Sequence, residues 1–520
     1  MNSTPACNPS TPWNPAQRTT FFVAAFAIVV GWLSIATAPY ILTTIGDELG
    51  FSIDRANILR IAPSAASLIA VFIAGALGDA FGCKKILISG GLISCVGIAI
   101  VLCSQSFDVM LIGRALEGIG TMLLRVVSLA LVAAAFPTPT QRAIAFSGFA
   151  AISPVTQILG PSMVAPLASL AGWRTVVAGW LILGLLFVLT TQKLLPNDDG
   201  SNKKIEFTTP VLAGVALILL SSAISTFQAS ARTALLLLAV AILVIAALKT
   251  IIQRLRSPAF DFTLPSQPGA IFVLIALASV NVADPVFFTA LFLQKQHNML
   301  IALTGVALIP LNIASALGNL IAGPVIARIG AYRTMQAGFL ISAAIALSVF
   351  TIKPDTPMGA VIALMSLFLL FQMIASPAML TTVMSLVPTH LAGVASSWRN
   401  AAQILGVAVG GVLVGNIIFN TFQESLAAML DNSALTTQQA EHIASLIRQG
   451  HRELIPGDLQ IMPATALNAL IDPDGPVIDL AQVIGYRTLG PAMALAHVIA
   501  CLALWLAKRS QTAAQAQTRD

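Results

Sequence analysis

Charged residues are scarce in this chain, and their scarcity sets the first limits on what the protein can be. Only 9% of its 520 residues are Asp, Glu, Lys or Arg, while 57% are apolar; an average soluble domain has about a quarter charged residues. The five cysteines lack disulfide or metal-ligand spacing, and the five histidines are scattered. We find no nucleotide-binding loop, metal cluster or plausible nucleophile–base set. The sequence therefore argues against a soluble globular protein and against an enzyme, and it predicts no metal and no cofactor.

Long apolar runs are what the sequence has instead. A helix rises about 1.5 Å per residue, so about 20 apolar residues cross the roughly 30 Å of a bilayer core. The polar N-terminus lacks the apolar core and cleavage site of a secretory signal, so the first run should be retained. We expect an all-α integral membrane protein with fourteen spans, at 21–45, 57–80, 86–104, 108–136, 143–170, 174–193, 209–230, 233–252, 269–294, 300–327, 334–352, 358–387, 391–420 and 484–507.

Positive residues are unevenly distributed between the two sides of these spans. If the N-terminus lies inside, the inner loops and tails hold fifteen Lys and Arg residues and the short outer loops hold five. Because cytoplasmic loops attract positive residues, we expect both termini in the cytoplasm. We expect the protein in the plasma membrane, which is the inner membrane of a bacterium. The same distribution accounts for the net charge of +6 without any binding of nucleic acid.

Two short sequences repeat about half a chain apart. GALGDAFGCKK (Gly75–Lys85) and GPVIARIGAYR (Gly323–Arg333) share their glycine spacing at an offset of 248 residues. QILG occurs at 157–160 and again at 403–406, an offset of 246. Together the repeats indicate two homologous halves, an architecture in which transporters place a site between the halves.

The repeats suggest how the chain divides. We expect a cytoplasmic tail at 1–20, a six-helix bundle at 21–195, linkers and two extra central spans at 196–266, a second six-helix bundle at 267–510, and a cytoplasmic tail at 511–520. Within the second bundle, an outer loop at 421–483 carries eight acidic residues. The capping-box spacing of Thr436 and Gln439, with a stop at Gly450, favours a short outer helix, and a solvated hairpin is the alternative.

The glycine-spaced turns suit gating loops. Glycines let the backbone turn sharply and let helices approach closely, and Asp79 can accept hydrogen bonds from a helix N-terminus or from an Arg. A latch that forms in one conformation only would bias which side of the protein is open; the alternative is an anchor that only sets topology. The gating residues we expect are Gly75, Asp79, Gly82, Lys84, Lys85, Gly323, Gly330 and Arg333.

Ionisable residues inside the spans are costly and by default functional. Arg114 and Glu117 lie one turn apart in the span 108–136. An ion pair favours the charged form of such an acid, whereas burial favours its neutral form, and this balance suits an acid that exchanges protons. The alternative is a static ion pair that ties two helices together. Asp284, next to Pro285, is a second candidate acid. We therefore expect Arg114, Glu117 and Asp284 to couple protons.

Polar side chains recur at helical spacing in several spans, which predicts the lining of a central cavity, although each stripe alone could be packing between helices. Four interior arginines, at 60, 114, 125 and 399, outnumber the two interior acids, so the cavity suits an anionic or zwitterionic solute. The alternative is that each Arg snorkels or bonds to backbone carbonyls. The substrate-binding residues we expect are Thr121, Arg125, Asn281, Phe288, Asn312, Arg399, Asn400 and Gln403.

With these motifs in place, the chain resembles the major facilitator superfamily, and within it the fourteen-span drug:proton antiporter branch, over nearly its whole length. The loop between the family's spans 2 and 3 is matched by Gly75, Asp79, Gly82, Lys84 and Lys85. The span-4 motif is matched by Arg114, Gly118 and Gly120, and the end of span 5 and the loop after it by GP at 160–161 and GWR at 172–174. The long loop before the last span also suits this branch.

The sequence departs from that family at three points. Glu117 stands in place of the usual Gln, Ser34 falls where the family has a span-1 acid, and Val164 and Ala165 replace paired glycines. The last two changes affect features that the family associates with proton-coupled export of cationic drugs. The resemblance therefore implies transport more directly than it implies drug export.

The function we expect is that of a secondary active transporter, which exports a small organic molecule by alternating access in exchange for protons, in the manner of a multidrug efflux antiporter. A transporter of an anionic metabolite and a non-transporting membrane sensor or scaffold are the alternatives. A scaffold would move neither protons nor solute. The expected partners are a small-molecule substrate, protons and the lipid bilayer, and the protein is expected to be a monomer.

Overall fold

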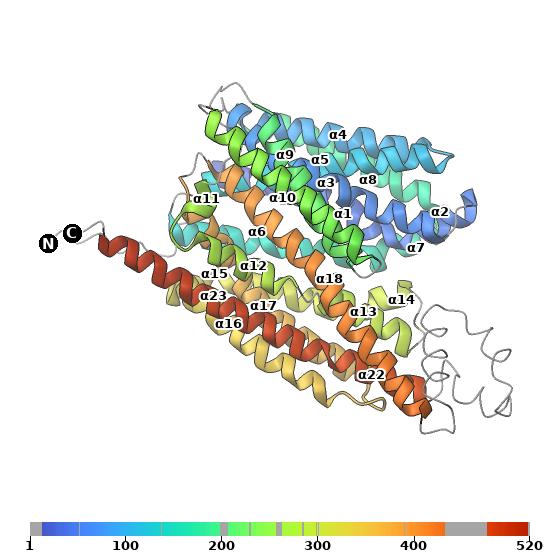
Figure 1. Cartoon of the computed structure of the whole chain (residues 1–520). Coiled ribbons are helices and arrows are strands. Elements are labelled where there is room, and N and C mark those ends of the chain that lie inside the picture. The colour runs from blue at the N-terminus through green and yellow to red at the C-terminus, as the bar shows by residue number, and fades with distance from the viewer. Residues whose placement is uncertain are drawn as a thin grey trace.

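The structure of the protein is a computed structural model in which helices make up nearly all of the described residues (Figure 1). The described residues are 13–50, 53–136, 138–197, 206–227, 230–255, 263–282, 285–297, 299, 301–388, 391–431 and 476–517.

The N-terminal half consists of eight helices with two short irregular helical turns between them. The helices are α1 (Pro15–Thr37), α2 (Leu42–Leu49), α3 (Ile53–Phe81), α4 (Cys83–Cys103), α5 (Phe107–Ala135), α6 (Pro139–Leu159), α7 (Ala165–Ala171) and α8 (Trp173–Leu194). A 3-10 turn (Ala38–Tyr40) links α1 to α2, and a π-helical segment (Gly160–Val164) links α6 to α7.

The rest of the chain adds a helix pair and then the C-terminal half. The pair is α9 (Thr208–Thr226) and α10 (Ala231–Arg254), which pack on each other, and α9 also packs on α3 and on α18. The short α11 (Thr263–Ser266) follows. The C-terminal half comprises α12 (Ala270–Val280), α13 (Pro285–Gln296), α14 (Ile301–Ala307), α15 (Ile309–Ile329), α16 (Ala331–Leu347), α17 (Met358–Ser385), α18 (Ala392–Asp431), α22 (Pro476–Arg487) and α23 (Leu489–Gln517).

Every expected span contains a helix, but the count of fourteen is not confirmed. Among the described residues, thirteen helical stretches are long and apolar enough to cross a bilayer, whereas the apolar part of α9, at 208–224, falls short of that length. The all-helical membrane fold itself is confirmed, because the thirteen stretches run through both halves of the chain.

Helices extend past three boundaries of the expected division, which itself stays a prediction. α1 begins at Pro15, inside the expected tail 1–20, because Asn14 caps it: Asn14 Oδ1 accepts the Gln17 N–H at 2.7 Å, and Gln17 Oε1 accepts the Asn14 N–H at 3.1 Å. α23 continues to Gln517, inside the expected tail 511–520. Residues 421–431 and 476–483 of the expected outer loop are helical, and its remainder, 432–475, lies outside the described residues.

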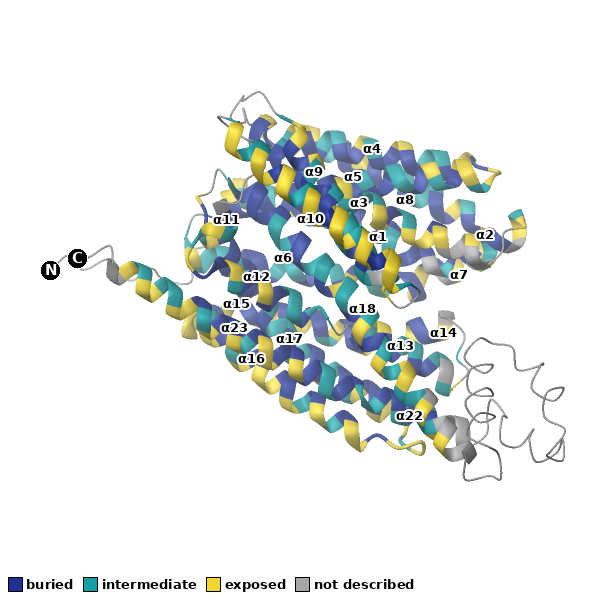
Figure 2. Cartoon of the chain, in the orientation of Figure 1, coloured by how far each residue is buried: buried dark blue, intermediate teal, exposed yellow. Residues whose placement is uncertain are grey.

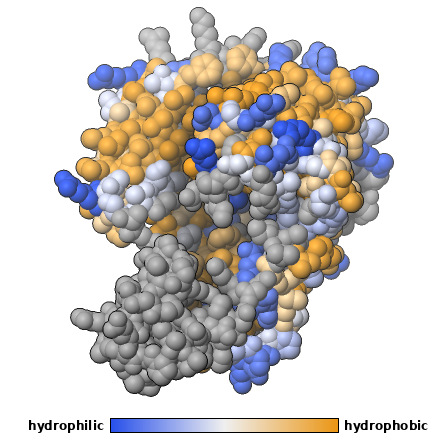
Figure 3. All heavy atoms as spheres, turned by 90° about the vertical axis from the view of Figure 1, so that its right-hand side faces the viewer, coloured by the Kyte–Doolittle hydropathy of each residue, from blue (hydrophilic) through white to orange (hydrophobic). Residues whose placement is uncertain are grey.

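The flanks of the molecule are apolar, as a bilayer requires. Figure 2 shows buried residues where helices face each other and exposed residues on the outward faces, most continuously along α10. The end on which α2, α7 and α14 lie is seen in Figure 3, where hydrophobic side chains cover much of the flank and hydrophilic ones gather toward the middle. Exposed leucines such as Leu236 and Leu243 of α10 illustrate this flank. Such a surface is stable against acyl chains and not against water.

The two repeated turns adopt the same backbone conformation. Gly82 (φ 90°, ψ 153°) and Gly330 (φ 83°, ψ 159°) each end one helix and begin the next, at α3–α4 and α15–α16. A side chain is disfavoured at such φ values, so glycine is required for the turn. The shared geometry supports the two-fold repeat inferred from the sequence.

Candidate functional site

A cavity of about 570 Å³ lies between the two halves. The N-terminal half contributes residues of α1, α5 and α6, and the C-terminal half contributes α12, α13 and α15 to α18. Much of the wall is apolar and aromatic, including Trp32, Phe149, Phe287 and Phe339. Apolar walls with a few convergent polar groups are typical of small-molecule sites.

Two arginines are the charged residues among the described lining. Arg125 of α5 places its guanidinium carbon 4.2 Å from the ring centroid of Trp32, a cation–π contact. Arg399 of α18 donates from Nη1 to Asn400 Oδ1 at 3.3 Å, and its buried Nε has no partner among the described residues. Both cations line the same cavity, and no described carboxylate lies within salt-bridge distance of either, so an anion entering the cavity would be attracted to both.

The structure gathers most, but not all, of the expected substrate-binding residues. Those on the cavity wall are Arg125, Asn281, Asn312, Arg399, Asn400 and Gln403. Thr121 instead donates to Gly118 O within α5 at 3.1 Å, and Phe288 packs in the core of the C-terminal half, because each faces a neighbouring helix. Asp284 lies outside the described residues, between two residues of the wall, Asn281 and Pro285.

Gln157 and Gln372 are among the lining residues that the sequence reasoning missed. Gln157 lies on the wall contributed by α6, and the repeated QILG could have identified it, since its counterpart Gln403 lines the wall contributed by α18. Gln372 is a single amide in the apolar helix α17 and is 5% exposed. A polar side chain buried in a membrane helix is itself a signal, because leaving it unbonded is costly.

The span at 269–294 is interrupted at the cavity. α12 ends at Val280 and α13 begins at Pro285, and both helix ends contribute to the wall. Gln372 Nε2 donates to Val280 O at 3.1 Å and so bonds one of the free carbonyls at the end of α12. Interrupted helices of this kind place helix termini at the binding sites of transporters.

Arg114 and Glu117 form an ion pair that is separate from the cavity. Arg114 Nη1 lies 2.5 Å from Glu117 Oε2, and Arg114 Nε donates to Leu59 O of α3 at 3.3 Å. Both side chains are buried, and Arg114 Nη2 and Glu117 Oε1 have no partner among the described residues. Gly118 lies directly against the backbone of Pro63, so α3 and α5 are in close contact beside the pair. Arg60 of α3 is exposed and does not contribute to the cavity.

Asp79 connects the two halves of the protein. Its carboxylate accepts the backbone N–H groups of Gly393 and Val394, at 3.0 and 3.2 Å, in the first turn of α18. A carboxylate at a helix N-terminus satisfies free N–H groups and interacts favourably with the helix dipole. Lys84 does not reach this site; its Nζ donates to Leu195 O and Asn197 Oδ1 just after α8. Lys85 and Arg333 are exposed.

Two further hydrogen bonds join α18 to the N-terminal half. Ser396 Oγ donates to Val126 O of α5 at 3.0 Å, and Ser397 Oγ donates to Val71 O of α3 at 2.7 Å, in the contact between α3 and α18. Gly75 permits this contact, because a Cβ at its position would collide with Ser397 Oγ and Gly393 O. Gly323 is in the equivalent place on α15, where a Cβ would lie 3.0 Å from Ile144 Cα of α6.

Comparison with known proteins identifies the family. Residues 21–411 match the model of the Major Facilitator Superfamily, which is more than half of the chain. The chain belongs to this superfamily. It is therefore a multi-pass membrane transporter of small molecules, and the major facilitator proteins are transporters rather than enzymes.

Curated relatives of this major facilitator protein are resistance and export proteins. A methylenomycin A resistance protein of Bacillus subtilis (strain 168) is 29% identical over 66% of this chain and 75% of its own. The puromycin resistance protein pur8 of Streptomyces alboniger is 26% identical over 72% and 76%. The tetracenomycin C resistance and export protein of Streptomyces glaucescens is 27% identical over 69% of each chain.

Solved structures support the fold. The human organic anion transporter MFSD10 (TETRAN) aligns over 94% of this chain and 100% of its own, with a TM-score of 0.59 and 12% identity. The proton:xylose symporter XylE aligns over 92% and 94%, with a TM-score of 0.53 and 16% identity. At these identities the likeness concerns the arrangement of helices in a major facilitator transporter.

Proposed function

We propose that this major facilitator protein exports a small organic anion from the cell in exchange for protons, by alternating access to the central cavity. The observation that carries the proposal is the pair Arg125 and Arg399, which both face the cavity between the halves without a described carboxylate. Guanidinium groups bind carboxylate or sulfonate oxygens bidentately. Export is supported by relatives that are named for resistance to antibiotics or for their export.

The proposal includes an orientation. Because the fifteen positive residues gather at the loops and tails on the side of the N-terminus, we place both termini in the cytoplasm of a bacterial cell, with the protein in the plasma membrane as a monomer. The contact between Asp79 and α18 then closes the cytoplasmic side. Separating α3 from α18 would open it, which makes this contact a gate.

Proton coupling is assigned to two acids of the expected spans. Glu117 has one oxygen bound to Arg114 and one oxygen without a described partner, so a proton taken up at this carboxyl would weaken the ion pair and its hold on α3. Asp284 is the second acid that we propose. The remaining ionisable residues of the described lining are the two arginines, which are not proton donors at physiological pH.

The first experiment tests transport and coupling in proteoliposomes. An imposed pH difference should drive accumulation of the permanently charged anion naphthalene-2-sulfonate, and not of the matched cation trimethyl(2-naphthyl)ammonium. Glu117→Gln keeps the shape of the side chain but cannot titrate, so it should fold normally and lose proton-driven accumulation. Asp284→Asn is measured in parallel, and Asp108→Asn, at an exposed acid of α5, is the matched control. Accumulation with an unchanged pH dependence in both Glu117→Gln and Asp284→Asn would refute the coupling assignment.

The second experiment tests the charge of the substrate by equilibrium binding to purified protein. Arg125→Gln and Arg399→Gln should each weaken binding of naphthalene-2-sulfonate by roughly tenfold or more, since a hydrogen bond to a charged group contributes about 1.5–3 kcal/mol. Arg254→Gln, at an exposed position of α10, should leave binding unchanged. Tight binding of the cation that survives both cavity substitutions would overturn the proposal of an anionic substrate.

A further inference from the structure

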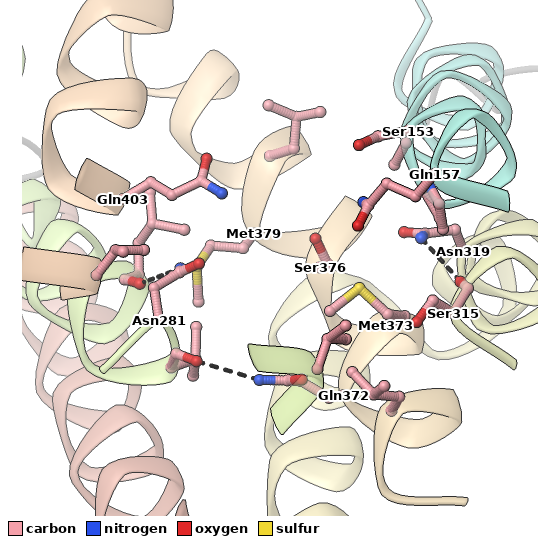
Figure 4. A pocket seen from close by; sticks show the side chains of 18 of the residues that line it. Ser153, Gln157, Asn281, Ser315, Asn319, Gln372, Met373, Ser376, Met379 and Gln403 are labelled. Carbon is pink, nitrogen blue, oxygen red and sulfur yellow. Dashed lines mark hydrogen bonds between the residues drawn. The ribbon is translucent and has the colours of Figure 1, made fainter. Parts of the chain in front are cut away.

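The amides of the cavity wall have a fixed orientation. Asn281 Nδ2 donates to Leu277 O at 2.7 Å, Asn319 Nδ2 to Ser315 O at 2.9 Å, and Gln372 Nε2 to Val280 O at 3.1 Å (Figure 4). A backbone carbonyl can only accept, so the NH₂ group of each amide must face it. The amide oxygens are therefore the groups that these side chains leave for other partners.

Three of the amide oxygens on the wall have no hydrogen-bond donor among the described residues. They are Asn319 Oδ1, Gln372 Oε1 and Gln403 Oε1, and all three are shielded from water. Asn319 is 1% exposed and Gln372 is 5% exposed. A buried acceptor without a donor costs about 1–3 kcal/mol, so the cavity wall holds acceptors that a ligand could satisfy after a small movement of the wall.

Two of these acceptors lie on helices that carry neither cation. Arg125 belongs to α5 and Arg399 to α18, whereas Asn319 and Gln372 belong to α15 and α17. Gln403 follows Arg399 by one turn of α18 and points its amide into the space shown in Figure 4. One part of the wall therefore offers positive donors, and another part offers neutral acceptors.

We infer that the cavity selects organic anions that also carry a hydroxyl or N–H donor at a distance from the acid group. The acid group binds at Arg125 and Arg399, and the donor binds the oxygens of Asn319, Gln372 or Gln403. Apolar and aromatic walls enclose the body of the molecule between these two ends. This inference rests on the proposed function for its anionic end and adds the requirement for a donor. A site built to bond a hydroxyl discriminates strongly against an analogue that lacks it, because its own polar groups are then left unpaired.

The experiment measures equilibrium binding of a matched series to the full-length protein in nanodiscs. The probes are naphthalene-2-sulfonate, 6-hydroxynaphthalene-2-sulfonate and 6-methoxynaphthalene-2-sulfonate, which share their charge and ring. The hydroxyl compound should bind about tenfold more tightly than the methoxy compound, which accepts but cannot donate. Equal binding of the two in the wild-type protein would overturn the inference without any variant being needed.

Variants then locate the donor site. Asn319→Leu and Gln372→Leu, alone and together with Gln403→Leu, should remove the advantage of the hydroxyl compound over the methoxy compound, and this ratio is compared within each variant so that a change in binding of the unsubstituted sulfonate does not affect it. Asn420→Leu, at an exposed position of α18, is the matched control. A hydroxyl advantage that persists in the triple variant would overturn the assignment. A hydroxyl advantage without any preference for anions over cations would instead refute the proposed function and leave the donor site in place.

Discussion

Two of the contacts between the halves are built differently, although they occupy equivalent places in the repeat. α3 meets α18 through the hydrogen bonds of Asp79 and Ser397, and Ser396 adds a bond from α18 to α5. α15 meets α6 through small and apolar side chains such as Ala143 and Ala322, and no side-chain hydrogen bond joins these two helices among their described residues. The residue equivalent to Asp79 at the offset of 248 is Ala327. One contact is thus polar and specific, and the other is apolar and tolerant of sliding.

The difference follows from how each helix start is capped. α6 is capped by its own Thr138, whose side chain accepts the Gln141 N–H at 3.3 Å. The first turn of α18 is instead bonded by Asp79 from the opposite half. A local cap is kept in any conformation, whereas a cap supplied by the other half is lost when the halves separate. The two halves therefore share the backbone conformation of the turn. Asp79 makes the contact between α3 and α18 depend on how the halves are arranged.

Asp79→Asn should give the largest effect. The amide keeps the shape and one acceptor oxygen, but it places an NH₂ group, which cannot accept, against one of the two N–H donors of α18, and it removes the charge. Losing charge-assisted bonds should cost about 1.5–3 kcal/mol, so turnover in proteoliposomes should fall roughly ten- to hundredfold. Affinity for naphthalene-2-sulfonate should be nearly unchanged, since Asp79 lies outside the cavity. With Asp108→Asn as the control, normal turnover of Asp79→Asn would reduce this loop to a topology anchor.

Gly75→Ala should rank second and should exceed Gly323→Ala. The added methyl collides with Ser397 Oγ and Gly393 O at the polar contact, and overpacking of this kind costs about 1–3 kcal/mol. At Gly323 the nearest atoms lie 3.0 Å or more away, so smaller movements of α6 accommodate the methyl. Spin labels at exposed Phe81 and Ile329, in a background without native cysteines, would report the separation of the halves. A larger shift for Gly323→Ala would contradict the comparison.

Ser397→Ala should have a moderate effect. It removes one hydrogen bond between the halves, which is worth about 1 kcal/mol, and so should change the distribution measured with the same spin labels by roughly fivefold. Ser147→Ala in α6 is the matched control, because Ser147 Oγ donates to Ala143 O of its own helix. Equal shifts for the two variants would show that the polar contact has no special role.

The smallest effect is expected at a hydrogen bond within one half. Glu48 accepts from Arg174 and, at 2.7 Å, from Trp173 Nε1, which joins α2 to α8. The Arg174 bond, and then the Trp173 bond, lower the pKa of Glu48 below its ordinary value. A lowered pKa stabilises the folded protein above the pKa of the unfolded carboxyl, and that stabilisation is lost as the pH falls through the folded value. Glu48→Gln should therefore be slightly less heat-stable than the wild type at pH 7 and not at pH 3. A shift of the spin-label distances in this variant would contradict its confinement to one half.

The sequence was sufficient for the fold because the bilayer restricts the choices. Apolar length alone located the helices, and the repeat of glycine turns located the equivalent positions of the halves. Asp79 was predicted to accept from a helix N-terminus, and the structure shows which helix that is, α18. That partner could not be read from the sequence, because the contact joins residues more than 300 positions apart.

The cavity was less accessible to sequence reasoning. Helical spacing correctly grouped Asn312 and Arg399 with the wall, since their helices turn one polar stripe inward. The same reasoning placed Thr121 on the wall, because it shares a helical face with Arg125. In the structure, the neighbours of α5 change along its length. The same face of α5 lines the cavity at Arg125 and packs against α3 at Gly118. Helical periodicity in a sequence shows which residues share a face of a helix. Only the packed structure shows which neighbour that face contacts at each position along the helix.

The helix α9 has a consequence for the lipids around the protein. It lies against both α3 and α18, and Gly214 brings it so close that a Cβ there would be 3.0 Å from Ile69 O. The polar contact between the halves therefore has a helix, rather than acyl chains, on this flank. In the opening that we propose, α3 and α18 part and water enters from the cytoplasmic end, while α9 keeps the side toward the bilayer closed. The additional helix pair would in this way keep phospholipid tails out of the opened cavity, so that the transporter moves its solute without also moving lipid between the leaflets.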